Sequence, residues 1–520
     1  MFVIILILIL IVYLIWQFGT RNFAYWKKRG VKHEEPVFFF GNLYRVFTQK
    51  ISLAGQVKEW YEKFPEEKYV GVHMTNNLGL VLRDPEMIKC VLVTDFQYFH
   101  QRGFHAHKHV RESLFQNMFT GDGDVWKLSR QRLTPAFSSA KIKGMFHLIE
   151  RTTEKMLQIT EAGNHDVKEL MARYTTDFIG SCGFGLDFDS LSDENTMFRC
   201  LGRRIVKFTP RDALVHFLKS LSPELFKHLD YFDPEIRDSM AYLVKYILNA
   251  RNYEPSGRND FVDLLLEVRQ KGKLVGLSLE HFNSDGTAKS VEIELDDQLI
   301  MAQMFVFFAA GFETSSSATS FLLHELAFEP EIQDRCHREI DEILSRYDAD
   351  LIDPTRLLSI LNWLSTSRET LRLHPSPGYL IRKCGKKYTF PGTSLTIDED
   401  VRILVPLQGL HKDLKYFEDP ETFKPERFSP DNVENLHKFV YMPFGDGPRT
   451  CIGKILTYVR ISYEEIFLVP LKEKLETLFL NAWRNQININ PYYNRSLPRA
   501  TRRCGQKLVS NNYVCHHFKP

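Results

Sequence analysis

A ten-residue stretch toward the end of the chain contains one cysteine whose neighbours suit a reactive thiolate. Phe444, Gly447, Arg449, Cys451 and Gly453 spell the pattern Phe-x-x-Gly-x-Arg-x-Cys-x-Gly. At average residue usage, this pattern arises by chance in about one of ten thousand chains of this length. Gly447 allows a tight backbone bend, and Gly453 allows a flat group to approach without a Cβ in the way. The pattern therefore predicts a binding loop rather than a core cysteine.

The chemistry of this loop follows from its charges. Cys451 is expected where a loop enters a helix, and there the free N–H groups and the helix dipole favour the thiolate. Arg449 can fork onto a carboxylate of a bound cofactor. A thiolate under haem iron donates electron density and favours O–O cleavage. The other seven cysteines are interpreted as inert core residues and include no Cys-x-x-Cys pair, which favours a reducing compartment.

The motif resembles the haem-binding signature of the cytochrome P-450 superfamily. The nearest resemblance is to insect P-450s of family six, and it rests on three stretches, 126–137, 307–317 and 443–453. It implies a mainly α fold with a smaller β lobe and haem b as the cofactor. It also implies a monooxygenase of xenobiotics, and of some endogenous lipids, that receives NADPH-derived electrons from a reductase, with cytochrome b5 as a second partner.

A second motif, Ala310-Gly311-Phe312-Glu313-Thr314, lies inside a long helix predicted for 300–327. Glycine and a buried acid are both unfavourable inside an apolar helix. One interpretation is a close helix crossing with one solvated acid. The resemblance implies an oxygen-activation groove instead, in which Gly311 loosens the helix, Thr314 hydrogen-bonds the oxygen, and Glu313 lies on the proton path.

Further residues are assigned by the same resemblance. Trp126 and Arg130 form a Trp-x-x-x-Arg pattern that would contact one haem propionate, and Arg382 would reach the other. Glu369 and Arg372, three residues apart on one helical face, would form a buried network with the arginine of Pro425-Glu426-Arg427-Phe428. That network is expected to be structural rather than catalytic.

The N-terminus predicts a membrane anchor. Residues 2–16 are an unbroken apolar run, and basic residues follow it. The run lacks a basic region before it and a cleavage site after it, so it is interpreted as a retained anchor. Positive charge after the run predicts that the body faces the cytosol. The resemblance implies that the membrane is that of the endoplasmic reticulum. The predicted organisation is an anchor at 1–20, a hinge at 21–42, a catalytic domain at 43–453 and an atypical segment at 454–520.

The bulk composition limits the other functions. The formal net charge of +2 gives no sign of nucleic-acid binding, and no Gly-x-Gly-x-x-Gly fingerprint is present, so the electrons must come from a partner. Lys127, Arg132 and Lys454 are candidates for docking an acidic reductase face. The chain contains 40 Phe and 21 Tyr, which suits small apolar substrates.

Local patterns predict the rest of the fold. Strands are expected within 69–84, helices across 141–253, and an exposed polar connection over 271–297 with a turn at 283–286. The substrate pocket is expected to be lined by 99–119, 208–217, 305–314 and 378–380.

The segment after Gly453 departs from the resemblance. A helix with Ile455, Val459, Ser462 and Ile466 on one face is expected, with Arg460, Glu464 and Glu465 toward solvent. Such a narrow apolar stripe suggests a misjoined segment and an inactive product. A haem-thiolate isomerase is the other alternative, and the Glu313-Thr314 pair argues against it.

Overall fold

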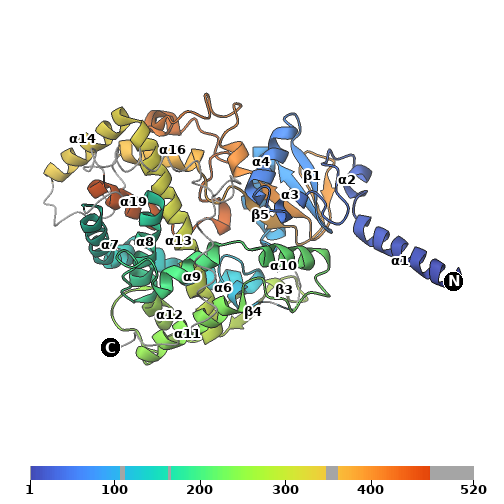
Figure 1. Ribbon diagram of the computed structural model, residues 1–520, viewed down its shortest axis with the longest axis horizontal. Helices are drawn as coiled ribbons and strands as arrows, with labels where there is room; N and C mark the ends of the chain where they lie inside the picture. Colours follow the sequence, from blue (N-terminus) through green and yellow to red (C-terminus); the bar gives the residue numbers. More distant parts are fainter. Residues whose placement is uncertain (1, 106–109, 111, 162–165, 347–360, 469–520) are drawn as a thin grey trace.

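The computed structural model describes residues 2–105, 110, 112–161, 166–346 and 361–468. Helices form most of the body, and the strands other than β3 (Leu274–Phe282) and β4 (Ala288–Ile293) gather in a smaller lobe beside the N-terminal helix (Figure 1). The predicted combination of a mainly α chain with a smaller β lobe is therefore confirmed. The helices of the helical body before residue 271 are α6 (Gly123–Leu133), α7 (Ser139–Glu161), α8 (Val167–Ile179), α9 (Met197–Val206), α10 (Pro210–Leu221), α11 (Pro234–Ala250) and α12 (Phe261–Gln270).

The β lobe contains a four-stranded sheet. Its strand order is β1 (Tyr69–Met74), β2 (Asn77–Leu82), β8 (Arg402–Val405) and β5 (Leu380–Lys383). β1 and β2 are the strands expected within 69–84, and they form an antiparallel hairpin. β2 pairs with β8 in parallel, and β8 pairs with β5 in antiparallel fashion. Short helices and a small hairpin complete this lobe: α3 (Tyr44–Phe47), α4 (Leu53–Lys63), α5 (Pro85–Lys89), β6 (Tyr388–Thr389) and β7 (Thr396–Ile397).

The long helix predicted for 300–327 is α13 (Asp297–Phe328), which runs through the helical body (Figure 1). The carboxylate of Asp296 caps it by accepting a 2.8 Å hydrogen bond from the N–H of Leu299. α8 packs along it so closely that a Cβ on Gly311 would lie 2.2 Å from Cδ1 of Ile179. The absence of a side chain at Gly311 therefore allows α8 and α13 to cross closely.

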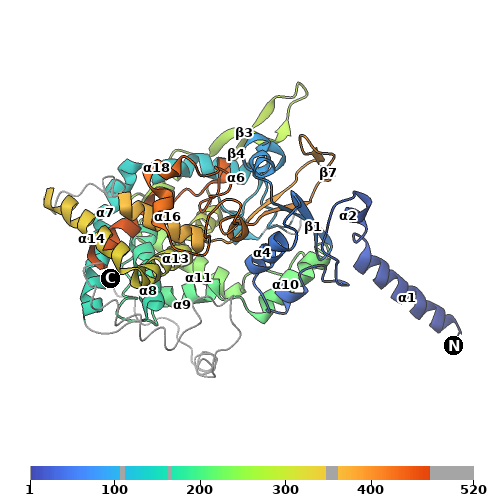
Figure 2. The same ribbon diagram turned by 90° about the horizontal axis from the view of Figure 1, so that it is seen from above.

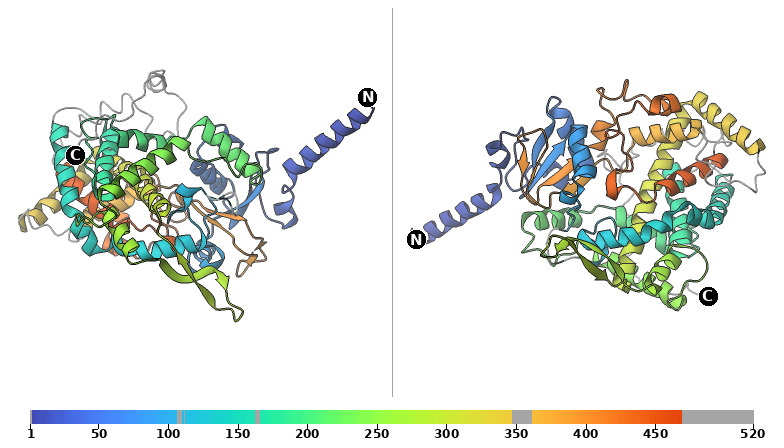
Figure 3. Two further views of the ribbon diagram at one scale, coloured as in Figure 1. Left: turned by 90° about the horizontal axis from the view of Figure 1, so that it is seen from below. Right: turned by 180° about the vertical axis from the view of Figure 1, so that it is seen from behind.

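The polar stretch 271–297 is folded rather than a simple connection. It forms an antiparallel hairpin of β3 (Leu274–Phe282) and β4 (Ala288–Ile293), which projects from the body (Figure 3). The turn lies where it was predicted, and the N–H of Gly286 donates to the Asn283 carbonyl. The strands were missed because most of their side chains are exposed, so the burial pattern is weak. The hairpin packs on α6 and thereby supports the helix that carries Trp126.

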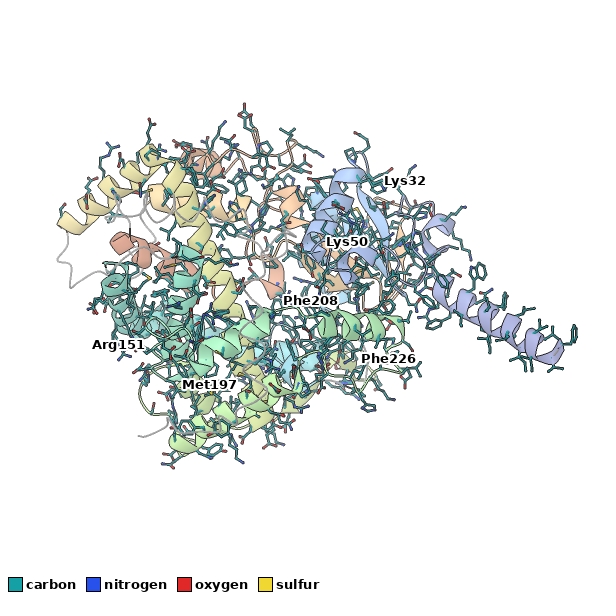
Figure 4. All side chains as sticks on the ribbon, in the orientation of Figure 1. Lys32, Lys50, Arg151, Met197, Phe208 and Phe226 are labelled. Carbon is teal, nitrogen blue, oxygen red and sulfur yellow. The ribbon has the colours of Figure 1, made fainter. Side chains whose placement is uncertain are left out.

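α1 (Phe2–Thr20) projects away from the body, with its apolar side chains exposed on all sides (Figures 2 and 4). At 1.5 Å per residue its 19 residues span about 28 Å, close to the thickness of a bilayer core. α13 is the other described helix that is long and apolar enough to cross a membrane, but most of it is buried in the body. α1 is therefore the candidate anchor.

The residues after α1 pack on the sheet. α2 (Tyr25–Lys28) inserts Trp26, which is fully buried and donates its indole N–H to the Val72 carbonyl at 3.0 Å. A Cβ on Gly71 would lie 2.5 Å from this indole ring, so glycine is required for the contact. His33 then pairs with Gly71 in an isolated parallel β-bridge. The segment 21–42 is thus attached to the β lobe at several points.

The predicted ion-pair network is buried. In α16 (Leu361–Leu373), Arg372 donates to both carboxylate oxygens of Glu369 at 2.8 Å, and neither side chain is exposed. Arg427, in the short helix η7 (Pro425–Phe428), donates to the same carboxylate at 3.4 Å. Arg372 also donates to the carbonyls of His411 and Pro420. This confirms a structural network that ties α16 to the chain before the cysteine loop.

α14 (Pro330–Arg346), α17 (Leu407–Leu410) and α18 (Pro430–Val433) lie between α13 and the last described helix, α19 (Lys454–Leu468). The helix expected after Gly453 is therefore present. The expectation that Arg460 faces solvent is wrong, because Arg460 is 1% exposed and contacts α13. Tyr458, Val459 and Ile461 are buried as well, so the buried face is broader than the spacing of aliphatic residues suggested. The rest of 454–520 lies outside the described residues.

Candidate haem-thiolate site

The cysteine loop is shaped by its glycine. Gly447 opens the short helix η8 (Gly447–Arg449) at a φ of +73°, and a Cβ there would lie 1.9 Å from the Leu92 carbonyl oxygen. The loop then closes through a 2.9 Å hydrogen bond from the N–H of Cys451 to the Phe444 carbonyl. α19 begins three residues later, so Cys451 lies just before a helix N-terminus, where the sequence placed it.

Cys451 is solvent-accessible although many protein atoms surround it. Those atoms raise the pKa of its thiol by desolvation, while the N–H of Gly453 and the charges of Arg130, Arg102 and Lys454 act in the opposite direction. A Cβ on Gly453 would meet nothing closer than Cys451 Sγ, at 4.0 Å, among the described residues. An accessible sulfur with cations nearby suits a metal ion, because the metal displaces the thiol proton.

Arg449 ties the cysteine loop to the chain before α6. Its Nε donates to the His100 carbonyl at 2.6 Å, and Nη2 donates to the Gly121 carbonyl at 2.8 Å. Nη2 also lies 3.4 Å from Oδ1 of Asp122, and Nη1 donates to the Phe119 carbonyl. The sequence analysis predicted that this guanidinium binds a cofactor carboxylate. In the structure, most of its N–H groups instead donate to carbonyl and carboxylate oxygens of the protein.

Two other buried arginines have spare donors. Arg102 and Arg382 are 8% and 1% exposed, and within the described part of the chain the Nε of each has no hydrogen-bond partner. Burial lowers the pKa of Arg102 to about 10. Burial, followed by the charges of Arg102 and Arg449, lowers the pKa of Arg382 well below its usual value. Each shift shows that the cationic form is held at a cost.

The cluster formed by Arg102, Arg382 and Arg449 fits a dianion. Asp122 is the carboxylate that offsets all three charges, and one carboxylate cannot neutralise three guanidinium groups. Buried cations of like sign are costly unless an anion pairs with them. The two carboxylates of haem b would supply that anion, and Cys451 lies close enough to Arg102 to affect its pKa. The residues present therefore fit a haem, and Cys451 is the residue that would hold its iron.

Trp126 and Arg130 lie on α6 beside this cluster. The ring centre of Trp126 is 4.3 Å from the guanidinium carbon of Arg449, and Arg130 donates from Nη2 to the Thr450 carbonyl at 2.8 Å. Phe444 packs edge-on against Tyr458 with ring centres 5.2 Å apart. The structure therefore gathers all seven sequence-predicted cofactor residues around one loop or its neighbouring arginines.

The middle of α13 is uncovered on one face. Ala310 and Thr314, one turn apart, are exposed although most of the helix is buried. The Thr314 hydroxyl donates to the Ala310 carbonyl at 2.5 Å, which takes up a helical acceptor. Glu313 is half-buried, and its carboxylate has no hydrogen bond to another described residue. The Glu313 carboxylate and the Thr314 hydroxyl thus belong to adjacent residues in the uncovered part of the helix.

The aromatic residues predicted to line the substrate pocket lie in separate parts of the structure. Phe99 belongs to the core of the β lobe, 4.9 Å from the Tyr388 ring, and Phe217 stacks on Phe40 near the N-terminal segment. Phe115 and Phe305 do approach each other, through Phe232, whose ring centre is 5.2 Å from that of Phe115 and 5.0 Å from that of Phe305. Phe232 lies outside all the predicted stretches.

Sequence reasoning also missed Arg102, His100 and Asp122. The Nδ1 of His100 is buried without a partner among the described residues, and burial lowers the pKa of this side chain to about 4. Asp122 accepts the N–H of Arg102 at 2.7 Å and thereby orders the loop. A basic residue before a glycine and an acid before a helix are common features, so neither signal was specific.

A cysteine loop with buried cations and a helix that carries an acid and an alcohol are both present, and they fit a haem-thiolate enzyme. Comparison with known proteins agrees: the family model for cytochrome P450 matches residues 31–464. The chain belongs to the cytochrome P450 family and is an oxidoreductase of the monooxygenase type.

Several insect proteins are similar over most of the chain. Cytochrome P450 6B2 of Helicoverpa armigera is 37% identical over 451 residues, which cover 86% of each chain. Probable cytochrome P450 6a13 of Drosophila melanogaster is 34% identical over 463 residues, covering 86% of this chain and 88% of the relative. Cytochrome P450 6B1 of Papilio polyxenes is 36% identical over 457 residues, covering 85% and 87%. The resemblance to insect family-six proteins is thereby confirmed.

Proposed function

We propose that this protein inserts one oxygen atom into small apolar organic compounds, such as xenobiotics and some lipids. The haem, when bound, supplies the oxygen-activating iron chemistry. The balanced reaction takes RH, O₂, NADPH and a proton to ROH, water and NADP⁺. The observation that carries the proposal is the buried cluster of Arg102, Arg382 and Arg449 beside the accessible Cys451.

The chain's own residues have separate parts in this proposal. Arg102 and Arg382 pair with the cofactor's carboxylates through their spare N–H groups. Cys451 would hold the haem iron through its thiolate sulfur. With haem bound, the Thr314 hydroxyl would be placed to hydrogen-bond oxygen, and Glu313, whose carboxylate has no hydrogen bond to another described residue, would supply protons along the same face. The aromatic contacts among Phe115, Phe232 and Phe305 offer an apolar surface for the substrate.

The electrons come from NADPH through a separate reductase, with cytochrome b5 as a second donor. Arg132 and Lys454 are exposed, and Lys127 is half-exposed, which leaves these cations accessible to an acidic partner. α1 anchors the protein in the endoplasmic reticulum membrane, with the body on the cytosolic side. Its unbroken apolar surface supports insertion in a membrane.

The test is to express the full chain, purify it in detergent and combine it with a microsomal reductase and NADPH. We expect the reduced carbon monoxide complex to show the red-shifted Soret band of thiolate ligation, and an apolar substrate to be hydroxylated. In Thr314→Ala the band should persist while electrons appear as hydrogen peroxide instead of product. A protein that binds haem with this band but hydroxylates none of a broad apolar panel would contradict the substrate class. Unchanged coupling in Thr314→Ala would remove Thr314 from the oxygen site.

A further inference from the structure

Arg460 is buried where α19 meets α13 and α8. Its Nη2 donates to the Ser315 carbonyl at 3.1 Å and to Oγ1 of Thr319 at 3.2 Å. The Thr319 hydroxyl in turn donates to the same Ser315 carbonyl at 3.3 Å. The guanidinium carbon lies 5.9 Å from the ring centre of Tyr174 and 6.0 Å from that of Phe178, both on α8. One side chain therefore contacts both of the other helices.

These three hydrogen bonds form a closed triangle. The donor directions are consistent, because Nη2 has two N–H groups and the Thr319 hydroxyl can accept one while donating its own proton. A charged donor on a buried carbonyl makes a stronger hydrogen bond than a neutral donor does. The Ser315 carbonyl is thus held toward α19.

The hydrogen bonds from Arg460 to α13 lie next to the proposed oxygen site. Ser315 directly follows Thr314, so fixing the Ser315 carbonyl restricts the rotation of the helix at Thr314. On the other side, the Thr175 hydroxyl of α8 donates to the Phe312 carbonyl at 3.3 Å, and Gly311 packs on Ile179. The stretch 311–319 is therefore fixed by α8 and by α19 while Ala310 and Thr314 remain uncovered.

α19 also begins three residues after Cys451. Arg460 lies six residues after the first residue of α19, which is fewer than two helical turns. The same helix therefore connects the cysteine loop at its start with α13 at Arg460.

We propose that Arg460 is a positioning residue for Thr314. By holding the Ser315 carbonyl, it fixes the position of the Thr314 hydroxyl relative to the cysteine loop, and this keeps oxygen reduction coupled to substrate hydroxylation. The proposal rests on the proposed monooxygenase function for its catalytic consequence. Its structural part, the hold on α13, does not depend on that function.

The experiment compares Arg460→Met with Arg460→Lys in the full-length protein purified in detergent. Methionine retains the length and loses the donors, whereas lysine retains one charged donor. Arg237→Met is the matched control, because Arg237 is a surface arginine on α11 that pairs with Asp230 and Asp238. Hydrogen exchange of peptides covering 310–323 reports on the hold. The fraction of NADPH electrons recovered as peroxide, per haem, reports on coupling.

We expect exchange in 310–323 to be about tenfold faster in Arg460→Met, as loss of a charged hydrogen bond predicts. The peroxide fraction should rise several-fold, the Soret band of the reduced carbon monoxide complex should stay in place, and KM should change less than kcat. Arg460→Lys should fall between the Met variant and the wild type. Arg237→Met should match the wild type.

Two results would overturn the proposal. One is unchanged exchange in 310–323, and the other is a lower haem content with an unchanged peroxide fraction per haem. If Arg460→Met does not accumulate, Thr319→Val opens the triangle with a smaller change and is judged by the same two measurements. A wild-type protein that shows no hydroxylation would contradict the proposed function, while the exchange data would still decide whether Arg460 holds α13.

Discussion

The guanidinium carbon of Arg449 lies 4.3 Å from the centre of the Trp126 ring, so two side chains assigned separately to the cofactor contact each other. Arg449 also donates to the carbonyls of His100 and Gly121. The arginine of the cysteine motif therefore holds the loop against α6 and the chain before it. Its removal should disturb protein order as well as cofactor binding, which makes Arg382 the cleaner probe of the cofactor's charge.

Replacing Cys451 by Ser should abolish the red-shifted Soret band of the reduced carbon monoxide complex. A hydroxyl cannot replace the soft thiolate donor. Absorption difference spectra of the purified protein measure this directly. Cys200→Ser is the matched control, because Cys200 is an exposed cysteine on α9. If the Cys451 variant kept the band, another group would have to be the ligand.

Replacing Arg382 by Leu should affect the haem-free and haem-bound protein in opposite directions. Without haem, loss of a buried cation next to two others should raise the midpoint of thermal unfolding. With haem, loss of a charged partner should weaken binding by about 1.5–3 kcal/mol. Haem per protein and the rate of haem transfer to apomyoglobin are the measurements. Arg132→Leu, at an exposed arginine, should change neither, and full haem retention in Arg382→Leu would refute the assignment.

Replacing Glu369 by Gln should destabilise the fold severely. The carboxylate is fully buried and accepts hydrogen bonds from Arg372 and Arg427, so its loss leaves buried cations without a partner. Breaking a buried pair typically costs about 3–5 kcal/mol. Denaturation by urea measures the change. Glu426→Gln removes a half-exposed partner of Arg335 and should cost less than about 1 kcal/mol. Similar midpoints for the two variants would show that the network is dispensable.

The protein should lose stability as the pH falls below about 6.5. Burial lowers the pKa of His411 to about 3, and the N–H of Met442 donates to its Nε2 at 3.1 Å, so the folded state keeps this side chain neutral. Burial likewise lowers the pKa of His73 to about 4. The unfolded chain takes up protons near pH 6.5 while the folded chain does not, so stability is complete above that pH and declines below it.

The expected slope is up to about 1.4 kcal/mol per pH unit for each such histidine. Unfolding midpoints measured from pH 7.5 to pH 5 test it. His411→Gln keeps an acceptor for the Met442 N–H without titrating, so its slope should be shallower. A wild-type midpoint that stays constant over this range would contradict the assignment of neutral buried histidines.

Deleting residues 1–20 should release most of the protein from membranes without removing the haem spectrum. α1 contacts little of the body, and its side chains are exposed, so its loss exposes no core. Flotation with vesicles and the carbon monoxide difference spectrum are the two measurements. Residual binding is expected through the apolar surface near Leu214, which is exposed on α10. Loss of haem on deletion would show that α1 belongs to the core.

The sequence predicted those features that depend on local residue types. The cysteine loop, the Glu369–Arg372 pair and the length of α13 each follow from a short motif or a long apolar run. The hairpin of β3 and β4 was missed because two exposed strands show little alternation of burial. Arg460 was misplaced because a buried arginine looks like a surface residue until its acceptors, here on α13, are known. Arg102 and Asp122 were missed for the same reason, since only the fold brings them beside Arg382.

The burial of Trp26 limits how far α1 can move relative to the β lobe. α1 ends at Thr20, and Trp26 is already locked into the sheet through Val72 and Gly71. Only a few residues therefore separate the proposed anchor from a rigid attachment point, and they leave little slack for independent motion. In a bilayer, a change in the tilt of α1 would also change the orientation of the β lobe. Because the tilt of a spanning helix depends on membrane thickness, that thickness would affect the angle between the body and the lipid surface.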